Sequence, residues 1–327
     1  MAMSSLHFGW RVRVGAGLVA AALLAQPAVA QQYPTQQITL VVAFAAGGVA
    51  DTVARVIGQK LSERLKQNVV VENRGGAGGN LGAKIVAAAN PDGHTLLVTT
   101  TAVAINDTIS KNKGYVTDDL RPVAIAASTP ESLSVNPGNP AKTLGEFVQN
   151  AKGKSISFGT AGIGTGSYIA AEYFFRAIAK IESVHVPFTG GPPVISAGVG
   201  NHIDMVAVSL PAAVAAINQN QLRGLGVASP QRAPSVPNVP TYAEAGFPDF
   251  YAASWVGFFA PTKTADTIVA KLNGEINEII KDPDVVQRLS AVGFDAISKS
   301  QAETAAYFKS EVETWGKMAR TVGVTTD

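Results

Sequence analysis

Apolar and polar positions first form a regular pattern between residues 38 and 65. Residues 38–42 are apolar except for Thr39, which is typical of a buried strand. After the turn Ala45-Ala46-Gly47-Gly48, apolar residues recur at helical spacing from Val53 to Leu65 and predict an amphipathic helix. Such a turn leaves backbone N–H groups, and the partial positive charge of a helix start, at the end of the sheet. Two interpretations stay open at this point: an ordinary tight turn and an anion site.

The same order of strand, glycine-rich turn and helix recurs in the middle of the chain. Residues 155–160 predict the strand, 161–167 the turn and 168–178 the helix. In this turn, the hydroxyl groups of Thr165 and Ser167 can donate to a ligand or cap the helix.

Three consecutive threonines, residues 99–101, follow another predicted strand at residues 95–98. Ligands of open α/β sheets lie beyond the carboxyl ends of the strands, so these hydroxyl groups can line a ligand cleft. They can equally cap the helix that follows, and the pattern does not separate these two roles.

Strands and helices alternate along the chain, which predicts an α/β protein, and the length is sufficient for two domains. Residues 120–127 and 133–135 predict two short strands, with a crossover between domains near residues 128–136. A strand at residues 254–260 is expected to return to the first domain. The expected domains are residues 31–131 plus 253–327 and residues 132–252.

The first thirty residues have the composition of an export signal. Arg11 and Arg13 precede an apolar run at residues 14–25, and Ala28-Val29-Ala30 has the form of a cleavage site. The apolar run is too short to cross a bilayer, which disfavours the alternative of a retained membrane anchor. We therefore expect residues 1–30 to be a signal peptide, cleaved after about Ala30.

Charge and composition exclude several classes of protein. Cleavage would remove Arg11 and Arg13, so the 26 lysine and arginine residues would fall to 24, equal to the 24 aspartate and glutamate residues. A neutral chain without a run of bases argues against binding to nucleic acid or to an anionic membrane. The chain has no cysteine, which excludes a disulfide framework and a thiolate zinc site.

The common signatures of enzyme chemistry are missing from the sequence. His94, His185 and His202 remain after cleavage, and no metal-binding spacing joins them. The nucleophile motif G-x-S-x-G is absent. His185 lies in an apolar strand, where a core histidine is expected, and nothing places Asp51 or Asp204 beside a second titratable group. We expect no catalytic residue, no bound metal and no cofactor.

A set of short motifs runs in order along the whole mature chain. Each motif is weak alone, whereas the ordered set is highly specific. The motifs are residues 38–48 with Asp51 and Arg55, then residues 70–80, 91–97, 184–188, 239–241 with 244–246, and Trp255 with 259–261. In this order they resemble the periplasmic solute-binding proteins of tripartite tricarboxylate transporters, also called the Bug family.

The resemblance implies a two-domain periplasmic-binding-protein-like α/β fold, with the ligand cleft between the domains and two or more crossovers. It implies a monomeric periplasmic protein that is not an enzyme. Such a protein captures a small carboxylate and delivers it to the membrane permease subunits of the transporter. The alternatives are a ligand-binding sensor of a signalling system and, less favoured, an exported small-molecule enzyme.

The resemblance also implies which residues form the ligand site. In such proteins a carboxylate is held largely by backbone N–H groups of the first strand–helix turn, partly through water, and by the facing loop of the second domain. Carried over by motif position, the expected ligand-binding residues are Phe44, Ala45, Ala46, Gly47, Gly48, Asp51, Thr100, Thr101, Thr165, Gly166, Ser167, Tyr168, Val208 and Ser209.

The sequence departs from the family pattern at several of these positions. Ala45-Ala46 stands where two prolines are common, Gly166 and Tyr168 stand where serine and histidine are frequent, and Val208 replaces a common aspartate. We interpret the changes at Gly166, Tyr168 and Val208 as a replacement of polar groups by apolar and aromatic surface. The hypothesis that follows is a dicarboxylate or aromatic carboxylate ligand, with terephthalate as the sharpest candidate.

Overall fold

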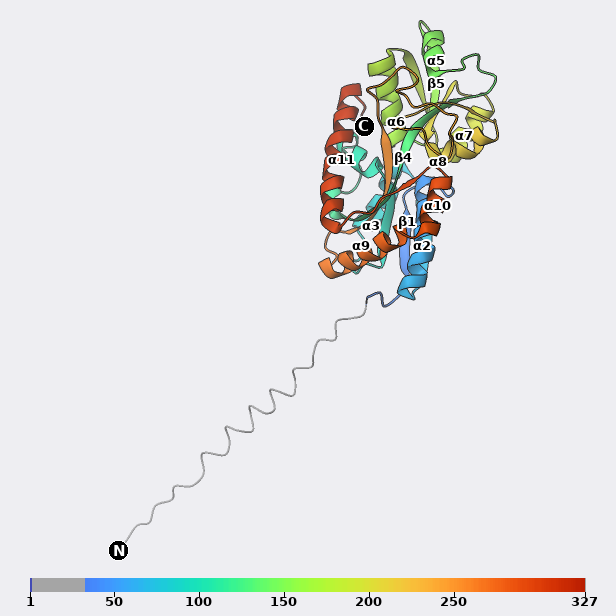
Figure 1. The fold of residues 1–327 in the computed structure, drawn as a ribbon. Helices are drawn as coiled ribbons and strands as arrows, with labels where there is room; N and C mark the ends of the chain where they lie inside the picture. The colour runs from blue at the N-terminus through green and yellow to red at the C-terminus, as the bar shows by residue number, and fades with distance from the viewer. Residues whose placement is uncertain (2–32, 327) are drawn as a thin grey trace. The chain divides into compact units, whose positions relative to one another are not determined.

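The computed structural model describes Met1 and residues 33–326. The expected signal peptide, residues 1–30, therefore lies outside the described part of the chain. The chain divides into one unit at Met1–Thr35 and a second at Gln36–Asp327, and every described helix and strand belongs to the second unit (Figure 1).

Ten strands of this second unit join in one sheet with the order β2-β1-β3-β9-β4-β7-β5-β6, while β8 and β10 pair with β4. The predicted α/β class is confirmed. The strands are β1 (Ile38–Val42), β2 (Val69–Asn73), β3 (Thr95–Thr100), β4 (Leu120–Val135), β5 (Ser155–Thr160), β6 (Glu182–Pro187), β7 (Met205–Ser209), β8 (Arg223–Val227), β9 (Ala253–Pro261) and β10 (Asp295–Ala296).

Strand β4 is the element that the two halves of the sheet share. Residues Leu120 to Pro130 pair with β9, and from Glu131 onward the strand pairs with β7 and β8. The prediction of two short strands here was wrong. Pro130 and its polar neighbours suggest a break, but the strand continues through them because its partner strand changes at this point. The domain boundaries at residues 131 and 253 stay a prediction.

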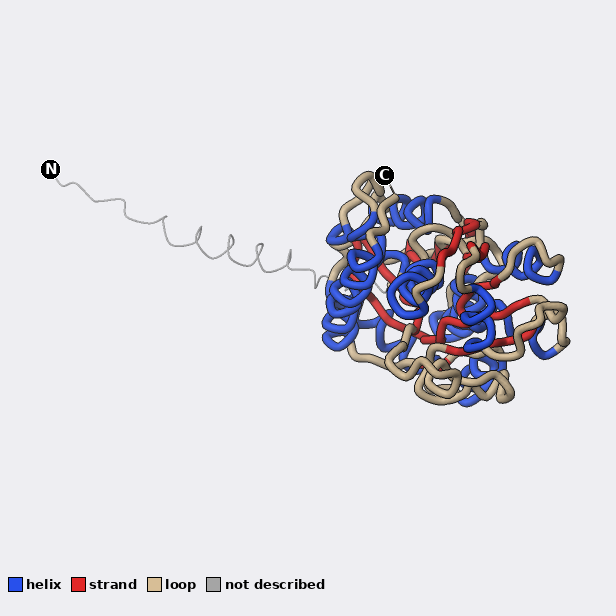
Figure 2. Tube along the Cα trace, turned by 90° about the horizontal axis from the view of Figure 1, so that it is seen from above, coloured by secondary structure: helices blue, strands red, loops and turns tan. Residues whose placement is uncertain are grey.

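Helices lie around the strands, which run through the interior of this unit (Figure 2). None of the helices in the described residues has the length and hydropathy needed to cross a bilayer. The helices are α2 (Val49–Leu65), α3 (Asn80–Ala87), α4 (Ala102–Ile109), α5 (Leu144–Ala151), α6 (Gly166–Glu172), α7 (Gly191–Val199), α8 (Leu210–Asn218), α9 (Asp266–Ile280), α10 (Pro283–Ala291) and α11 (Gln301–Val322), with 3-10 turns at Ala77–Gly79 and Thr117–Asp119 and a π-helical segment at Tyr173–Ala179.

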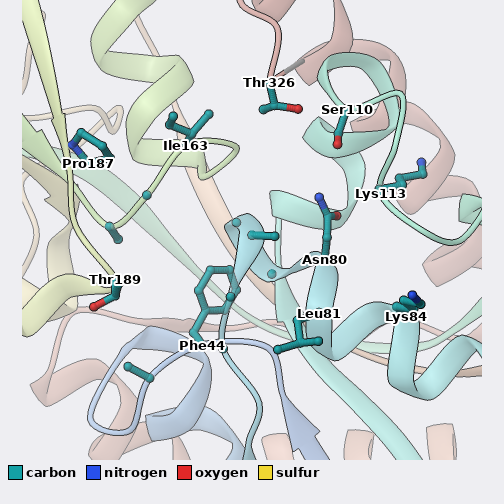
Figure 3. A pocket seen from close by; sticks show the side chains of 18 of the residues that line it. Phe44, Asn80, Leu81, Lys84, Ser110, Lys113, Ile163, Pro187, Thr189 and Thr326 are labelled. Atoms are coloured by element: carbon teal, nitrogen blue, oxygen red, sulfur yellow. The ribbon is translucent and has the colours of Figure 1, made fainter.

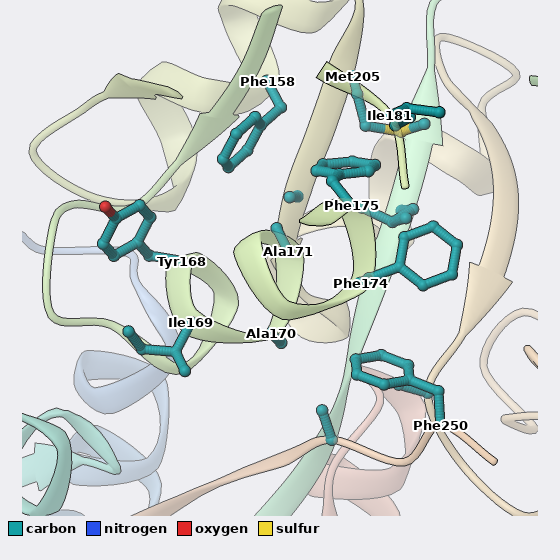
Figure 4. Close-up of a cluster of buried hydrophobic side chains, with 14 of the residues drawn as sticks. Phe158, Tyr168, Ile169, Ala170, Ala171, Phe174, Phe175, Ile181, Met205 and Phe250 are labelled. Carbon is teal, nitrogen blue, oxygen red and sulfur yellow. The ribbon is translucent and has the colours of Figure 1, made fainter. Parts of the chain in front are cut away.

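An aromatic core holds the elements around α6 in place (Figure 4). Phe174 is fully buried, and its ring packs edge-on against Tyr242 and Phe247 at centroid distances of 5.0 and 4.9 Å. Phe175 packs against Phe158 at 5.1 Å. Such aromatic pairs contribute stability in addition to that gained from burying apolar area. They therefore hold the segment that follows α6 in the core.

Removing the central ring should test this anchoring. We expect Phe174→Ala to lower the free energy of unfolding by about 3–5 kcal/mol, because the lost ring leaves a cavity in a packed core. Urea unfolding followed by circular dichroism measures the change. The exposed Tyr251 provides the control, since Tyr251→Ala should change the unfolding free energy by less than about 0.5 kcal/mol. Equal losses for the two variants would contradict the assigned core.

Candidate functional site

A small cavity of about 50 Å³ lies at the carboxyl ends of the strands. The segments that line it follow β1, β3, β5, β6 and β7, which is where ligands of α/β sheets bind. The expected site residues that line the cavity are Phe44, Ala45, Gly48, Thr100, Thr165, Gly166, Ser167, Val208 and Ser209. The structure thus brings together residues that lie up to 165 positions apart in the sequence, between Phe44 and Ser209.

Helix starts dominate the wall of this cavity. Gly48 is the N-cap of α2, and Gly190 is the N-cap of α7. Neither has a side chain that could satisfy the first N–H groups of its helix. In α7 the only such group after the N-cap is that of Gly191, because Pro192 and Pro193 have no backbone N–H. Thr165 is the N-cap residue of α6, and Ser209 is the N-cap residue of α8. Because each helix start carries a partial positive charge, their convergence makes the cavity favourable for an anion.

The described lining contains no charged side chain. An anion in this cavity would therefore be held by backbone N–H groups and by hydroxyl groups of the wall, which Thr100, Ser167, Ser209 and Ser254 provide. Hydrogen bonds to a charged group contribute about 1.5–3 kcal/mol each, so such a wall can bind an anion without an ion pair.

Asp51 does not line the cavity but fixes the turn that does. Its carboxylate is 2% exposed and accepts hydrogen bonds from the Gly47 N–H at 2.8 Å, from Arg55 Nε at 2.9 Å and from Asn73 Nδ2 at 2.9 Å. Asn73 Nδ2 also donates to the Phe44 carbonyl at 3.0 Å. The Gly47 N–H is consequently used inside the turn, and Ala46 and Gly47 do not line the cavity.

The facing turn is closed by its own hydroxyl groups. Thr165 Oγ1 donates to the Gly162 carbonyl at 2.7 Å and accepts from the Tyr168 N–H at 3.3 Å, as an N-cap does. Thr165 Oγ1 and Ser167 Oγ lie 3.1 Å apart. Thr165 therefore has the capping role, and both residues also line the cavity, while the role of ligand donor stays a prediction for Ser167.

Tyr168 is placed differently from the expectation. Its ring, which Figure 4 shows, does not line the cavity. The ring stacks on His185 at a centroid distance of 4.2 Å. Tyr168 lies two positions after Gly166, which is about 200° around a helix, so it faces away from the cavity that Gly166 borders. Partial burial lowers the pKa of His185 to about 4, so the imidazole is neutral at pH 7. The expected core position was wrong, because His185 is half-buried on β6, the last strand in the sheet order.

A buried cluster beneath the cavity was missed from the sequence. Glu131 is 3% exposed, and its carboxyl group accepts hydrogen bonds from Ser209 Oγ, at 3.1 Å to each oxygen, and from Ser254 Oγ. Thr101, an expected site residue, lies in this cluster with its Oγ1 3.1 Å from Ser254 Oγ and does not line the cavity. One signal could have revealed the cluster, because Glu131 is the only charged residue between Arg121 and Lys142.

Other lining residues were also missed. Val49, Ala50, Ala161, Gly190, Gly191 and Ala212 contribute backbone or small side chains to the cavity wall. Residues of this kind carry no chemical signature in a sequence, and only the start of a helix at Val49 and Gly191 gives them a role.

A larger cavity of about 850 Å³ adjoins the small one (Figure 3). Phe44, Ala45 and Ala161 line both cavities. The glycine-rich loop at residues 75–79 forms one wall of this cavity. Lys84 and Lys113 lie at its border, and Lys113 is paired with Asp107 at 2.8 Å.

The chain is similar to known proteins along most of its length. A family model described as "Tripartite tricarboxylate transporter family receptor" matches residues 53–324. The chain is 38% identical over 291 residues to the UPF0065 protein in the tcbD-tcbE intergenic region of Pseudomonas sp. (strain P51), which covers 88% of this chain and 86% of that protein.

Two solved structures have the same fold. An R. palustris protein with adipate has a TM-score of 0.86 and 29% identity, covering 90% of this chain and 99% of that chain. MatC from Rhodopseudomonas palustris with bound malate has a TM-score of 0.82 and 33% identity, covering 88% of this chain and 99% of that chain. The expected periplasmic-binding-protein fold is confirmed.

The Asp51 network makes a prediction about acid stability. Burial raises the pKa of Asp51, but hydrogen bonds from Arg55, Gly47 and Asn73 lower it further, so the pKa lies below its usual value of 3.8. A carboxylate with a lowered pKa stabilises the fold above the unfolded pKa and loses this effect as the pH falls through the folded pKa. We expect Asp51→Asn to cost about 1.5–3 kcal/mol of unfolding free energy at pH 7.

The cost should be smaller near pH 3, because the unfolded wild-type chain, with a carboxylate pKa near 3.8, takes up the proton there more readily than the folded protein does. Urea unfolding at both pH values measures this difference. Asp118→Asn, at an exposed carboxylate, is the control and should have little effect at either pH. A cost for Asp51→Asn that stays the same at both pH values would contradict the network.

Proposed function

The chain belongs to the tripartite tricarboxylate transporter family of receptors, and from this premise we propose that it captures a small carboxylate in its inner cavity. Proteins of this family are periplasmic solute-binding proteins and not enzymes. We further propose that the protein acts as a monomer, is exported by residues 1–30, and delivers its ligand to the membrane permease subunits of a transporter.

The observation that carries this proposal is the convergence of helix starts on a cavity without charged side chains. Micromolar binding corresponds to about 8 kcal/mol. One helix start contributes roughly 0.3–1 kcal/mol to an anion, and about 2 kcal/mol at best. Binding therefore needs donors from several elements, and the turns after β1, β3, β5, β6 and β7 supply them.

The sizes of the two cavities suggest how a ligand is arranged. About 50 Å³ is room for one carboxylate group or one to two waters, since a water occupies about 30 Å³ in the liquid. The adjoining cavity of about 850 Å³ lies within the range of about 300–1,000 Å³ that is typical of small-molecule sites. We propose that one carboxylate occupies the inner cavity and that the ligand body extends past Phe44, which borders both cavities.

Binding in this position would require the two predicted domains, residues 31–131 plus 253–327 and residues 132–252, to separate and close again. Closure would exclude water and strengthen each hydrogen bond to the carboxylate.

The surface of the site favours an apolar or aromatic ligand body. Phe44 and Val208 line the inner cavity, and Phe188 lines the outer one. The structural relatives with adipate and with malate make a dicarboxylate reasonable for this chain as well. We retain terephthalate as the sharpest candidate because Val208 and Phe44 give the inner cavity apolar and aromatic surface. The ring of Tyr168 does not contribute to this surface.

A thermal-shift panel tests the ligand class. We expect terephthalate or adipate to raise the melting temperature more than malate, citrate or glutamate, because a ligand that binds only the native state stabilises it in proportion to its affinity. The strongest shift with citrate or glutamate would contradict an apolar ligand body. A reduced uptake of the same acid in a deletion strain would distinguish transport from a sensor role.

Substitution of Gly48 tests the anion site itself. A β-carbon at Gly48 would lie 3.1 Å from the Ala45 carbonyl oxygen, and the backbone φ of −82° suits any residue. The remainder of a leucine would fill the inner cavity. We expect Gly48→Leu to weaken binding by roughly 100-fold or more, since several hydrogen bonds to the carboxylate are lost together.

The melting temperature of this variant should stay close to that of the wild type. Gly274→Leu is the matched control, because Gly274 is exposed on α9 with no atom within 4 Å of the added β-carbon. Calorimetric titration with the best acid of the panel measures both variants. Near-wild-type affinity for Gly48→Leu would contradict the proposed site.

A further inference from the structure

Glu131 occupies a position that the proposed function does not use. It is the first residue of β4 that pairs with β7, directly after Pro130 pairs with β9. Its carboxyl group therefore lies where the two halves of the sheet meet. There it contacts Ser209 at the end of β7 and Ser254 on β9, and both serines line the inner cavity.

The cluster is packed too tightly for water or a side chain to separate its members. A β-carbon at Gly166 would lie 2.8 Å from both Glu131 Oε1 and Thr101 Oγ1, and closer still to Ser254 Oγ. This contact brings the start of α6 directly onto the cluster. A change in the hydrogen bonds of Glu131 therefore also changes the hydrogen bonds of groups that line the cavity.

The hydroxyl protons in this cluster have two possible arrangements. An ionised Glu131 can only accept, so Ser209 and Ser254 both direct their single proton toward it and present oxygen lone pairs to the cavity. A neutral Glu131 donates its own proton to one of the two serines, whose hydroxyl proton is then available to a ligand. One added proton thus removes a negative charge below the cavity and frees one donor toward it.

We propose that Glu131 is a positioning residue that links carboxylate binding to the uptake of one proton, through the hydroxyl groups of Ser209 and Ser254. The inference rests on the proposed function, because it assumes a carboxylate in the inner cavity. Glu131 does not touch the ligand and acts only through the two serines.

The surroundings of Glu131 suit this role. Burial raises the pKa of Glu131 to about 7, although the hydrogen bonds from Ser254 and Ser209 lower it in part. The groups that face it are Ser209 from β7, Ser254 from β9, Thr101 before α4 and Tyr242 from the segment after β8. The pKa of Tyr242 is raised well above 10 by burial and then by the charge of Glu131, so Tyr242 stays neutral. No ion pair to Glu131 occurs in the described residues.

The direction of the pH effect follows from linkage. A bound carboxylate above the serines favours the neutral form of Glu131, so the pKa of Glu131 is higher in the complex than in the free protein. Affinity is then constant at low pH and falls as the pH rises through the free-state value of about 7. The dissociation constant should increase by up to about tenfold for each pH unit in this interval.

Calorimetric titration of the full mature protein tests the link. The probe is adipate, or terephthalate where that acid binds more tightly, at about pH 6 and about pH 8.5, since both carboxyl groups of a simple diacid are largely ionised over this range. Repeating each titration in two buffers with different ionisation enthalpies gives the number of protons taken up. This readout uses the unaltered protein and does not depend on any variant folding.

The variant Glu131→Gln mimics the neutral carboxyl group, because its amide donates to a serine at every pH. The wild-type protein should bind the acid about tenfold or more weakly at the higher pH than at the lower pH, and it should take up at most one proton on binding near pH 8. For Glu131→Gln we expect less than about twofold change between the two pH values and no proton uptake. Glu311→Gln is the matched control, since Glu311 has a raised pKa from burial but binds Trp255 and Trp315 away from the cavity; it should keep the wild-type pH profile.

Each outcome decides between the alternatives. Wild-type binding that is independent of pH, or a wild-type pH profile in Glu131→Gln, would overturn the inference and leave the proposed function intact. No binding of any acid by the wild-type protein would overturn both.

Discussion

The proposed site depends on one constraint: an anion must be held by backbone N–H groups and hydroxyl groups, because no charged side chain lines the described cavity wall. A single helix start is too weak for useful affinity, so several must end at one cavity. The fold achieves this by placing the turns after β1, β3, β5, β6 and β7 at the carboxyl edge of one sheet. Glycine at the N-cap of α2 leaves its first N–H groups without a competing side chain, and glycine at the N-cap of α7 does the same for Gly191, which precedes two prolines.

Polar side chains around the cavity fix the positions of the turns and helix starts that line it. Asp51 and Asn73 fix the turn before α2, and Thr165 caps α6 on the facing side. Behind α6, the aromatic core around Phe174 prevents the helix from shifting. Beneath the cavity, Glu131 joins Ser209 of one half of the sheet to Ser254 of the other. The charged groups therefore lie behind the wall, and the wall itself stays neutral.

Local sequence patterns were sufficient to predict most of the strands and helices and many of the residues that line the candidate site. The strand–turn–helix units at residues 38–65 and 155–178 were predictable because each is encoded by neighbouring residues. The orientation of Tyr168 was not, since an error of one residue in a helix start rotates a side chain by about 100°. The unbroken β4 depends on its pairing with β7 and β9. The contacts of Glu131 depend on Ser209 and Ser254, which lie 78 and 123 residues away, and no local pattern encodes such contacts.

The most direct test of the account is an NMR titration of the ¹⁵N-labelled protein with adipate, because amide protons report the hydrogen bonds that they donate. The account predicts that the largest downfield shifts occur at the helix starts, at Val49, Ala50, Ser167 and Gly191. Shifts concentrated at the lysines of the outer cavity, or elsewhere in the chain, would contradict the claim that backbone N–H groups hold the carboxylate.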